Sequence, residues 1–361
     1  MSDVVFVLGA GASKDGGAPL MREFLSVAKA LMKSSNLGNN VKRFEQVFAA
    51  IGSLQAVHSK AVLPLDNIEA IFATFEMAKV IGRMPAHEIG EIQALTPSLI
   101  ELIALTLEES IEFPIRGRNV LAPKTYEPFA NLLADLQTKA NPKRSVSVIT
   151  FNYDLGVDYA MYLRGLGPKY HVDKSDSPHG IPLLKLHGSL NWARCPDCQS
   201  ILPLHLAEYF KRKTWVASVL PMLNETVKSA KLQMRSEFAT LRHCQSGPSS
   251  TPVLVPPTWN KADYHSSLAE VWRQASDELG EAEYIIVIGY SFPMTDAFFQ
   301  YLYALGTVGR NPLERFWVFD PDTKVADRFR TILGPAAANT FHHDRFVFSG
   351  AIDPIRREFK L

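Results

Sequence analysis

The first segment that could do chemistry is Gly9-Ala10-Gly11-Ala12-Ser13, which directly follows the apolar run Val4–Leu8. Small residues at such a point let backbone N–H groups approach a pyrophosphate at the start of a helix. Glycines also serve ordinary turns, and Lys14 stands where a dehydrogenase fingerprint has its third glycine. The place of the segment after the first apolar run nevertheless predicts a site for an adenine dinucleotide, NAD.

A second polar segment, Thr150-Phe151-Asn152-Tyr153-Asp154, closes the apolar run 145–151. Asn152 and Asp154 are two residues apart, so on extended backbone their side chains project to the same side. They can act together on a ligand beyond the strand end. Alternatively, Asp154 caps the helix expected to begin at Leu155. Both interpretations of Asp154 stay open at this point.

The third segment is Leu186-His187-Gly188-Ser189, again at the end of an apolar run. An isolated histidine is commonly a structural residue, but Gly188 opens space beside this one. An imidazole that titrates near neutrality can accept a proton from a ribose hydroxyl or a water, or orient either of them. His187 is therefore a candidate catalytic residue.

Two further strand ends carry small or polar residues. Gly289-Tyr290-Ser291 follows the strongest apolar run of the chain, and Asp320 closes the next one. A carboxylate at such a position can accept hydrogen bonds from ribose hydroxyls. Because ligands of open α/β sheets bind beyond the carboxyl ends of the strands, these segments predict a shared ligand-binding rim.

The elements that must position these residues alternate between short apolar strands and helices. Continuous apolar strands are typical of a parallel sheet covered on both faces, so the pattern predicts an α/β fold with a doubly wound, Rossmann-like sheet. The expected strands are 4–8, 145–151, 183–186, 253–255, 284–289, 316–320 and an edge strand at 345–348. The expected helices are 67–79, 97–113, 155–163, 267–279, 296–305 and 323–333.

Two stretches interrupt this alternation and divide the chain. Residues 20–143 contain amphipathic helices and no convincing strand, and they are too long for one crossover, which predicts a large helical insertion. Residues 191–250 carry the cysteines and predict a small module. The NAD-binding core then comprises 1–19, 144–190 and 251–361.

Composition excludes several classes of protein. The net charge is only +1, so no whole-molecule field attracts nucleic acid or an anionic membrane, and direct nucleic-acid binding is not expected. The cluster Lys211-Arg212-Lys213 is interpreted as a solvated helix face. The N-terminus lacks the features of a signal peptide, and no apolar run is long enough to span a membrane. A cytoplasmic protein is therefore expected.

Cys195-Pro-Asp-Cys198 has the spacing of a zinc knuckle, and Cys244 is the only other thiol. A structural zinc usually has four ligands, so His243 or His205 would complete the set. Adjacent residues such as His243 and Cys244 are expected to reach one metal only rarely. The alternatives are a metal-free knuckle and a redox pair.

Taken in order, these segments resemble the motifs of the sirtuin superfamily. Sirtuins open with Gly-Ala-Gly ending in Ser and continue with Gly-Ile-Pro-Asp-Phe-Arg, which is similar to residues 9–13 and to Gly17-Ala18-Pro19-Leu20-Met21-Arg22 here. Their Thr-Gln-Asn-Ile-Asp resembles residues 150–154, their His-Gly resembles His187-Gly188, and their Gly-Thr-Ser resembles residues 289–291. Each motif is short, but their joint order is specific and covers about half of the chain.

The departures favour one branch of that superfamily. The Asp-Phe that helps arrange the nicotinamide end in sirtuins is Leu20-Met21 here, and the second Cys-x-x-C of the zinc ribbon is missing. The helical insertion, the Gly-Tyr-Ser turn and the segment 254–259 are similar to sirtuin-like effectors of bacterial antiphage defence, which hydrolyse NAD. The resemblance thus implies an NAD glycohydrolase that releases nicotinamide and ADP-ribose.

The resemblance also implies roles for individual residues. Asn152 would orient the attacking water and the ribose, His187 would be the general base or a ribose partner, and Asp154 would orient these groups or cap its helix. Residues 9–13 and Ser291 would hold the diphosphate and adenosine, with Arg22 near the diphosphate or ribose. Because uncontrolled NAD loss harms a cell, a gate is expected through oligomer assembly or a protein activator. The alternatives are an NAD-dependent protein deacylase and a non-catalytic NAD or ADP-ribose sensor.

Overall fold

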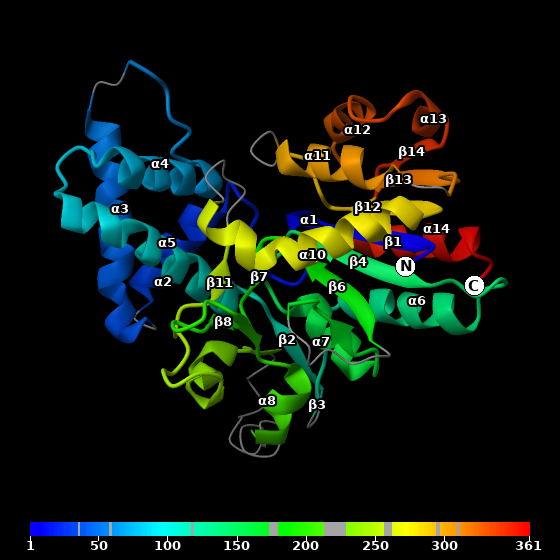
Figure 1. The fold of residues 1–361 in the computed structure, drawn as a ribbon, viewed down its shortest axis with the longest axis horizontal. Helices are drawn as coiled ribbons and strands as arrows, with labels where there is room; N and C mark the ends of the chain where they lie inside the picture. The colour runs from blue at the N-terminus through cyan, green and yellow to red at the C-terminus, as the bar shows by residue number, and fades with distance from the viewer. Residues whose placement is uncertain are drawn as a thin grey trace.

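Seven parallel strands form the central sheet, in the order β14-β13-β12-β1-β4-β6-β5 (Figure 1). The chain first builds outward from β1 through β4 and then returns to the other side of β1 with β12. The strands are β1 (Val4–Leu8), β4 (Val146–Thr150), β5 (Pro168–Lys169), β6 (Ile181–Lys185), β12 (Tyr284–Ile288), β13 (Arg315–Phe319) and β14 (Phe341–Asp344). This order confirms the predicted doubly wound α/β fold, whose switch point lies between β1 and β12.

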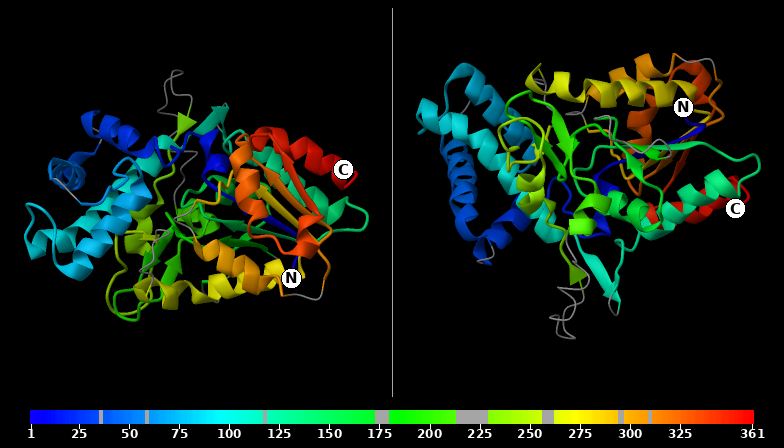
Figure 2. Two further views of the ribbon diagram at one scale, coloured as in Figure 1. Left: turned by 90° about the horizontal axis from the view of Figure 1, so that it is seen from above. Right: turned by 60° about the horizontal axis from the view of Figure 1, so that its bottom comes forward.

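Helices cover both faces of the sheet (Figures 1 and 2). On one face, Phe6 of β1 meets Phe129 of α6 (Tyr126–Thr138) edge-on, with ring centroids 5.1 Å apart, and α14 (Phe348–Glu358) packs beside α6. On the other face lie α10 (Ala262–Glu281) and α11 (Ala297–Gly306). Every residue of β1 is buried, which explains its uninterrupted apolar sequence.

Short helices connect the strands of the core. In α12 the first turn is capped by the Asp322 carboxylate, which accepts the Lys324 N–H. These helices are α1 (Ala10–Lys14), α7 (Gly156–Leu163), α12 (Thr323–Arg330) and α13 (Pro335–Ala338).

Residues between β1 and α6 form a helical lobe beside the sheet, drawn in blue and cyan in Figure 1. Helix α5 packs against α2, α3 and α4 and is its centre. Asn67 caps α4, and Glu88 with Glu91 makes a capping box at the start of α5. The lobe consists of α2 (Phe24–Lys33), the 3₁₀ turn Gly38–Asn40, α3 (Val41–Ala56), α4 (Ile68–Ile81) and α5 (Ile89–Ser110).

Among the described helices, α5 alone is long and apolar enough to cross a membrane. In the most apolar 18-residue stretch of α5, 61% is buried inside the protein. The apolar side chains of α5 are therefore those of a core helix against which its neighbours pack.

Three small sheets lie outside the main one. Val253–Val255, expected in the main sheet, instead contributes β11, which pairs antiparallel with β7. The region 20–143 also contains two short strands, β2 and β3, that its helical pattern did not indicate. The pairings are β2 (Phe113–Arg116) with β3 (Asn119–Val120) and β10 (Ser229–Ala230), β8 (Trp192–Arg194) with β9 (Ile201–Pro203), and β7 (Gly188–Ser189) with β11 (Val253–Leu254).

The edge strand and helix α5 begin at other residues than the sequence predicts. The edge strand is β14, while residues 345–347 form a connection and α14 begins at Phe348. Phe346 and Val347 look strand-like in sequence but are 44% and 51% exposed. Helix α5 begins at Ile89, eight residues before the expected start, because its capping box lies there and Pro97 is accommodated inside the helix.

The computed structural model describes residues 1–34, 37–57, 60–116, 119–172, 180–212, 229–255, 262–293, 297–308 and 311–361. Lys213, Asp296 and the run Pro256-Pro257-Thr258-Trp259 lie outside these residues. The remaining small elements are α8 (Leu206–Arg212) and a 3₁₀ helix, η3 (Met234–Thr240).

Arg235 of η3 joins the small module to the helical lobe. Its guanidinium lies 2.8 Å from a carboxylate oxygen of Glu101 and 2.8 Å from one of Glu108, both on α5. Burial nevertheless raises the pKa of Glu108 to about 7, because desolvation outweighs the attraction of Arg235. The charged form of Glu108 is therefore costly in the folded state.

At the switch point two glycine turns touch. The Gly11 N–H donates to the Gly289 carbonyl at 2.8 Å, and the Gly9 N–H donates to the Ile288 carbonyl at 3.2 Å. A Cβ on Gly9 would lie 2.4 Å from the Tyr290 Cα, and a Cβ on Gly289 would lie 2.5 Å from the Ala12 nitrogen. Gly289 also has a φ of +62°. The glycines thus permit one backbone to pack directly on the other.

We expect Gly289→Ala to lower the free energy of unfolding by about 2–4 kcal/mol, since the new methyl group clashes with backbone atoms at a positive φ. Gly52→Ala is the matched control, because a Cβ there meets no heavy atom within 4 Å. It lies inside α3 and should stabilise by about 1 kcal/mol or less. Urea unfolding of the three proteins measures both effects, and equal stability of Gly289→Ala and wild type would contradict the packing argument.

Glu108→Gln tests the lobe–module joint. A folded pKa raised from 4.5 to about 7 contributes stability that is complete below pH 4.5 and is lost as the pH rises through 7. Between about pH 5.5 and about pH 8.5 wild type should therefore lose about 2 kcal/mol more than Glu108→Gln. Denaturant titrations at both pH values measure the difference, with Glu109→Gln as the control. Parallel pH profiles for wild type and Glu108→Gln would contradict the assignment.

Candidate functional site

A cleft of about 770 Å³ opens over the carboxyl ends of β1, β4, β6, β12 and β13, facing the helical lobe. Its walls come from every core segment singled out in the sequence. The lobe adds Leu20–Glu23 and the start of α4, with Asn67 and Glu69. Of the predicted residues, the cleft is lined by Ala10, Gly11, Arg22, Asn152, His187, Gly289, Ser291 and Asp320.

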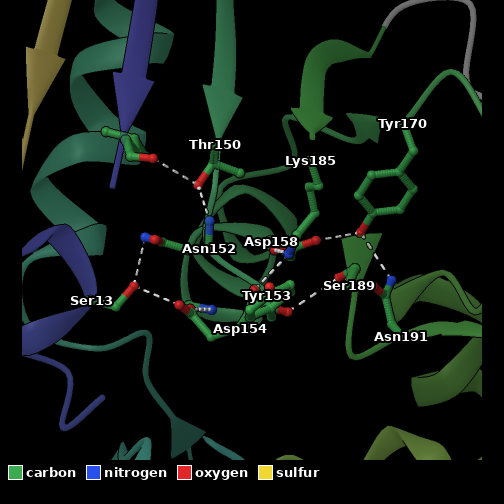
Figure 3. A network of polar contacts seen from close by, with 12 residues as sticks. Ser13, Thr150, Asn152, Tyr153, Asp154, Asp158, Tyr170, Lys185, Ser189 and Asn191 are labelled. Atoms are coloured by element: carbon green, nitrogen blue, oxygen red, sulfur yellow. Dashed lines mark hydrogen bonds and ion pairs between the residues drawn. The ribbon is translucent and has the colours of Figure 1, made fainter. Parts of the chain in front are cut away.

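Asn152 sits at the centre of a buried hydrogen-bond cluster (Figure 3). Its Nδ2 donates to the Gly9 carbonyl at 2.8 Å and to Ser13 Oγ at 2.9 Å. The Asn152 N–H donates to Thr150 Oγ1, which fixes the main chain as it leaves β4. Neither side-chain contact uses Asn152 Oδ1, so this atom is available to accept a hydrogen bond from a ligand or water in the cleft.

Ser13 faces this cluster rather than the cleft. Its hydroxyl donates to Asp154 Oδ2 at 2.5 Å and lies 2.8 Å from the Tyr126 hydroxyl. Only 2% of Ser13 is exposed. Gly9 and Ala12 do not line the cleft either, since they pack within the turn. Of the segment 9–13, Ala10 and Gly11 are the residues that reach the large cleft.

Asp154 contacts the start of α7 and the Ser13 hydroxyl, but unlike Asn152 it does not face the large cleft. Its Oδ1 accepts the Gly156 N–H at 2.8 Å and so caps the start of α7, while Oδ2 receives the Ser13 hydroxyl. The side chain lies against a smaller cavity and not against the large cleft. Burial raises the pKa of Asp154, although Lys185 and the hydrogen bonds from Ser13 and Gly156 oppose that shift.

His187 lines the cleft at the end of β6 and is 4% exposed. Its ring meets Phe151 edge-on at 5.0 Å, and Phe151 in turn stacks on Tyr290 at 4.2 Å. The His187 carbonyl accepts the Val255 N–H at 2.7 Å. Aromatic packing and the β7–β11 pairing therefore hold the imidazole in place.

The part of the cleft formed by the residues after β12 and β13 carries charges of both signs. Arg328 of α12 donates from Nε to the Ser291 carbonyl at 2.8 Å, and Asp320 Oδ1 accepts the Asp322 N–H at 2.9 Å. Burial raises the pKa of Asp320. Lys14 pairs with Glu23 at 3.5 Å near the mouth, where Arg22 also lies. Three cations and several carboxylates can thus meet a polar ligand with an anionic centre.

A smaller cavity of about 50 Å³ adjoins the cleft beneath Asn152. Its walls are mostly apolar and come from both the core and the lobe. Met21, Phe24, Ile68, Phe72, Ile103 and Leu107 provide the apolar wall, while Ser13, Glu69, Asn152 and Asp154 provide the polar groups. The polar groups thus lie at the edge of an otherwise apolar cavity.

The three cysteines lie together in the small module. Ligand atoms of Cys195, Cys198, His243 and Cys244 all lie within 4.8 Å of one another. His243 Nδ1 is 3.4 Å from both Cys198 Sγ and Cys244 Sγ. The expectation that adjacent His243 and Cys244 rarely share a site is therefore wrong here, since both side chains turn to the same point. His205 stacks on Tyr170 instead.

Several residues of the site were not anticipated from the sequence. Lys185 is visible in the sequence as the one charged residue of the apolar strand Ile181–Lys185. Tyr126, Arg328 and Glu69 gave none, since each lies on a helix with an ordinary amphipathic pattern. Their contributions depend on how α6, α12 and α4 dock against the strand ends.

No protein-family model matches the chain, and no curated protein matches it. Solved structures with a similar arrangement include a mutant Sir2 homologue in complex with ADP ribose, at 15% identity and a TM-score of 0.41, covering 99% of this chain and 92% of that one. A Sir2 enzyme studied for its mechanism and regulation has 15% identity and a TM-score of 0.44, with 99% and 93% covered. Sir2 with a p53 peptide and NAD+ has 15% identity and a TM-score of 0.38, with 99% and 93% covered.

Proposed function

We propose that this chain is an NAD glycohydrolase, which cleaves the nicotinamide–ribose bond to give nicotinamide and ADP-ribose. The observation that carries the proposal is the convergence of Asn152 and His187 on one cleft at the switch point of a doubly wound sheet. Dinucleotides bind at such switch points. The ordered sirtuin-like motifs of the sequence supply the reaction class.

The reaction needs a bound ribose, an oriented water and a place for the leaving group. The C1′–N1 bond breaks and its electron pair neutralises the pyridinium nitrogen, while a water oxygen bonds to C1′ and releases one proton. Asn152 Oδ1 is suited to accept a hydrogen bond from that water or from a ribose hydroxyl. His187 is the nearby group suited to take the proton or to orient a hydroxyl.

The rest of NAD fits the remaining walls. The small cavity beside Asn152 would receive the nicotinamide ring against Met21 and Phe72. Lys14, Arg22 and Arg328 would face the diphosphate, and Asp320 would accept hydrogen bonds from the adenosine ribose. Asp154 would act through Ser13 and Asn152, because it does not reach the large cleft.

The resemblance to antiphage effectors suggests when such an enzyme acts. We propose that its activity in the cytoplasm is gated by homo-oligomer assembly or by a protein activator. The helical lobe is the natural place for that gate, because Leu20–Glu23, Asn67 and Glu69 form one wall of the cleft. A shift of the lobe would change the cleft directly.

A deacylase is the second candidate. The second Cys-x-x-C of sirtuins is missing here, but Cys195, Cys198, His243 and Cys244 together offer four ligands for a zinc site.

Incubation of the purified chain with NAD, with and without an acetylated peptide, separates the candidates. Free ADP-ribose and nicotinamide in equal amounts without peptide are expected. Acetylated ADP-ribose formed only with peptide would instead identify a deacylase, and tight NAD binding without turnover would identify a sensor.

Asn152→Ala and His187→Ala should each lower NAD turnover by at least about 100-fold, since each removes a group aimed at the reacting ribose. Both variants should remain folded at the assay temperature, although each should have a lower thermal midpoint, because Asn152 loses two hydrogen bonds and His187 a buried ring. Asn311→Ala and His342→Ala serve as matched controls on exposed positions. Full turnover in either site variant would refute the roles assigned here.

We also propose that Cys195, Cys198, His243 and Cys244 bind one structural zinc. Two thiolates bound to one tetrahedral zinc lie about 3.8 Å apart, which suits ligand atoms that are all within 4.8 Å. Metal analysis of the purified chain should give one zinc per chain, and Cys198→Ser or Cys244→Ser should lose it. His205→Ala should retain it, and a wild-type chain without zinc after purification in zinc-containing medium would contradict the proposal.

A further inference from the structure

A fully buried ion pair lies behind the loop that carries Asn152 and Asp154. Lys185 and Asp158 each have no exposed surface, and Lys185 Nζ is 2.9 Å from Asp158 Oδ2. The same ammonium group donates to the main-chain carbonyl of Asp154 at 2.5 Å. Figure 3 shows Lys185 reaching from β6 toward this loop. One side chain thus connects β6, the β4–α7 loop and the first turn of α7.

The ion pair continues into a chain of hydrogen bonds. Tyr170 donates from its hydroxyl to Asp158 Oδ1 at 2.6 Å, and Asn191 donates from Nδ2 to the Tyr170 oxygen at 3.1 Å. Asn191 also donates to the Leu204 carbonyl at 3.0 Å and accepts the Ser189 hydroxyl at 2.6 Å. The network therefore runs from the small module to the Asp154 carbonyl.

Stability alone does not account for such a pair. Removing two charges from water costs several kcal/mol per ion, and well-packed apolar residues often do as well or better. Lys185 is the last residue of a strand whose other residues are apolar or proline. What a buried ammonium adds is a directed hydrogen bond to one carbonyl.

The loop depends on such anchors because its side chains must hold a fixed direction. The Tyr153 carbonyl accepts the Leu190 N–H at 3.0 Å, and the next carbonyl, Asp154, accepts Lys185. From Asp154 the side-chain bonds lead through Ser13 to Asn152 Nδ2. Loss of the Lys185 bond would let Asp154, and with it Asn152, shift relative to the cleft.

We infer that Lys185 is a positioning residue for the proposed reaction: it holds the Asp154 carbonyl so that Asn152 presents its Oδ1 to the ribose. The inference rests on the proposed function. Asp158 pairs with the Lys185 ammonium, but it does not itself touch the loop carbonyl. The two partners of one ion pair therefore differ in what they do for catalysis.

This difference gives a matched test. Asp158→Asn keeps one oxygen that can accept from Lys185 Nζ, so Lys185 can still donate to the Asp154 carbonyl, while the new amide N–H group faces the Tyr170 oxygen. Lys185→Met removes the donor. Both single variants should lose stability, because each breaks a buried pair. The double variant Lys185→Met/Asp158→Asn removes both charges of the pair and should regain part of that stability.

Steady-state kinetics with NAD should separate the variants. We expect kcat to fall about 10- to 100-fold in Lys185→Met and in the double variant, with KM changed less than about threefold, because small misplacements cost catalysis on this scale. Asp158→Asn should keep kcat within about threefold of wild type. If kcat follows thermal stability across all three variants, or if Lys185→Met keeps wild-type kcat, the inference fails.

Hydrogen exchange of residues 151–155 is measured on the same proteins and does not depend on turnover. Faster exchange in Lys185→Met and in the double variant, but not in Asp158→Asn, is expected, and unchanged exchange in both Lys185 variants would overturn the inference. The double variant supplies the answer if Lys185→Met does not fold. A wild-type chain that cleaves no NAD would defeat the proposed function alone, while the exchange result would still decide whether Lys185 holds the loop.

Discussion

The direct contact between two glycine turns at the centre of the sheet is the constraint on which the rest of this structure depends. Gly9 and Gly11 follow β1, Gly289 follows β12, and the backbones meet without any intervening side chain. This contact sets how closely the two halves of the doubly wound sheet approach at their carboxyl ends. The cleft, Asn152 and the Tyr290–Phe151 stack all take their positions from it.

The sequence predicted the sheet well because the physical signal is local. Parallel strands buried on both faces are continuous apolar runs, and those of β1, β4, β12 and β13 stand out from their surroundings. Strands with a weaker apolar pattern were not predicted correctly, because that local signal is missing from them. β14 at the edge reads Phe-His-His-Asp, whereas the more apolar segment 345–348 lies at the rim of the cleft.

The site residues that could be predicted from the sequence are those at the carboxyl ends of the strands, because these ends meet at one edge of the sheet. Asn152 and His187 are brought together by the sheet register, which the order of the strands determines. Ser13 was expected to hold the diphosphate but turns inward to Asp154, because the short helix α1 directs its hydroxyl toward Tyr126 of α6. The contact of Tyr126 with Ser13 joins segments far apart in sequence and has no signature in either segment alone.

The glycine contact has a consequence for how an anion would be held. The N–H groups of Gly9, Gly11 and Ala12 donate to the Ile288, Gly289 and Gly9 carbonyls and are therefore not free to face a diphosphate. An anion in the cleft would therefore depend more on long side chains, of which Arg22 and Arg328 lie on the cleft wall. Attraction between exposed charges is screened within about 10 Å at about 0.1 M salt. Ligand affinity in this cleft should accordingly vary with ionic strength more steeply than in a fold that cradles phosphates with its main chain.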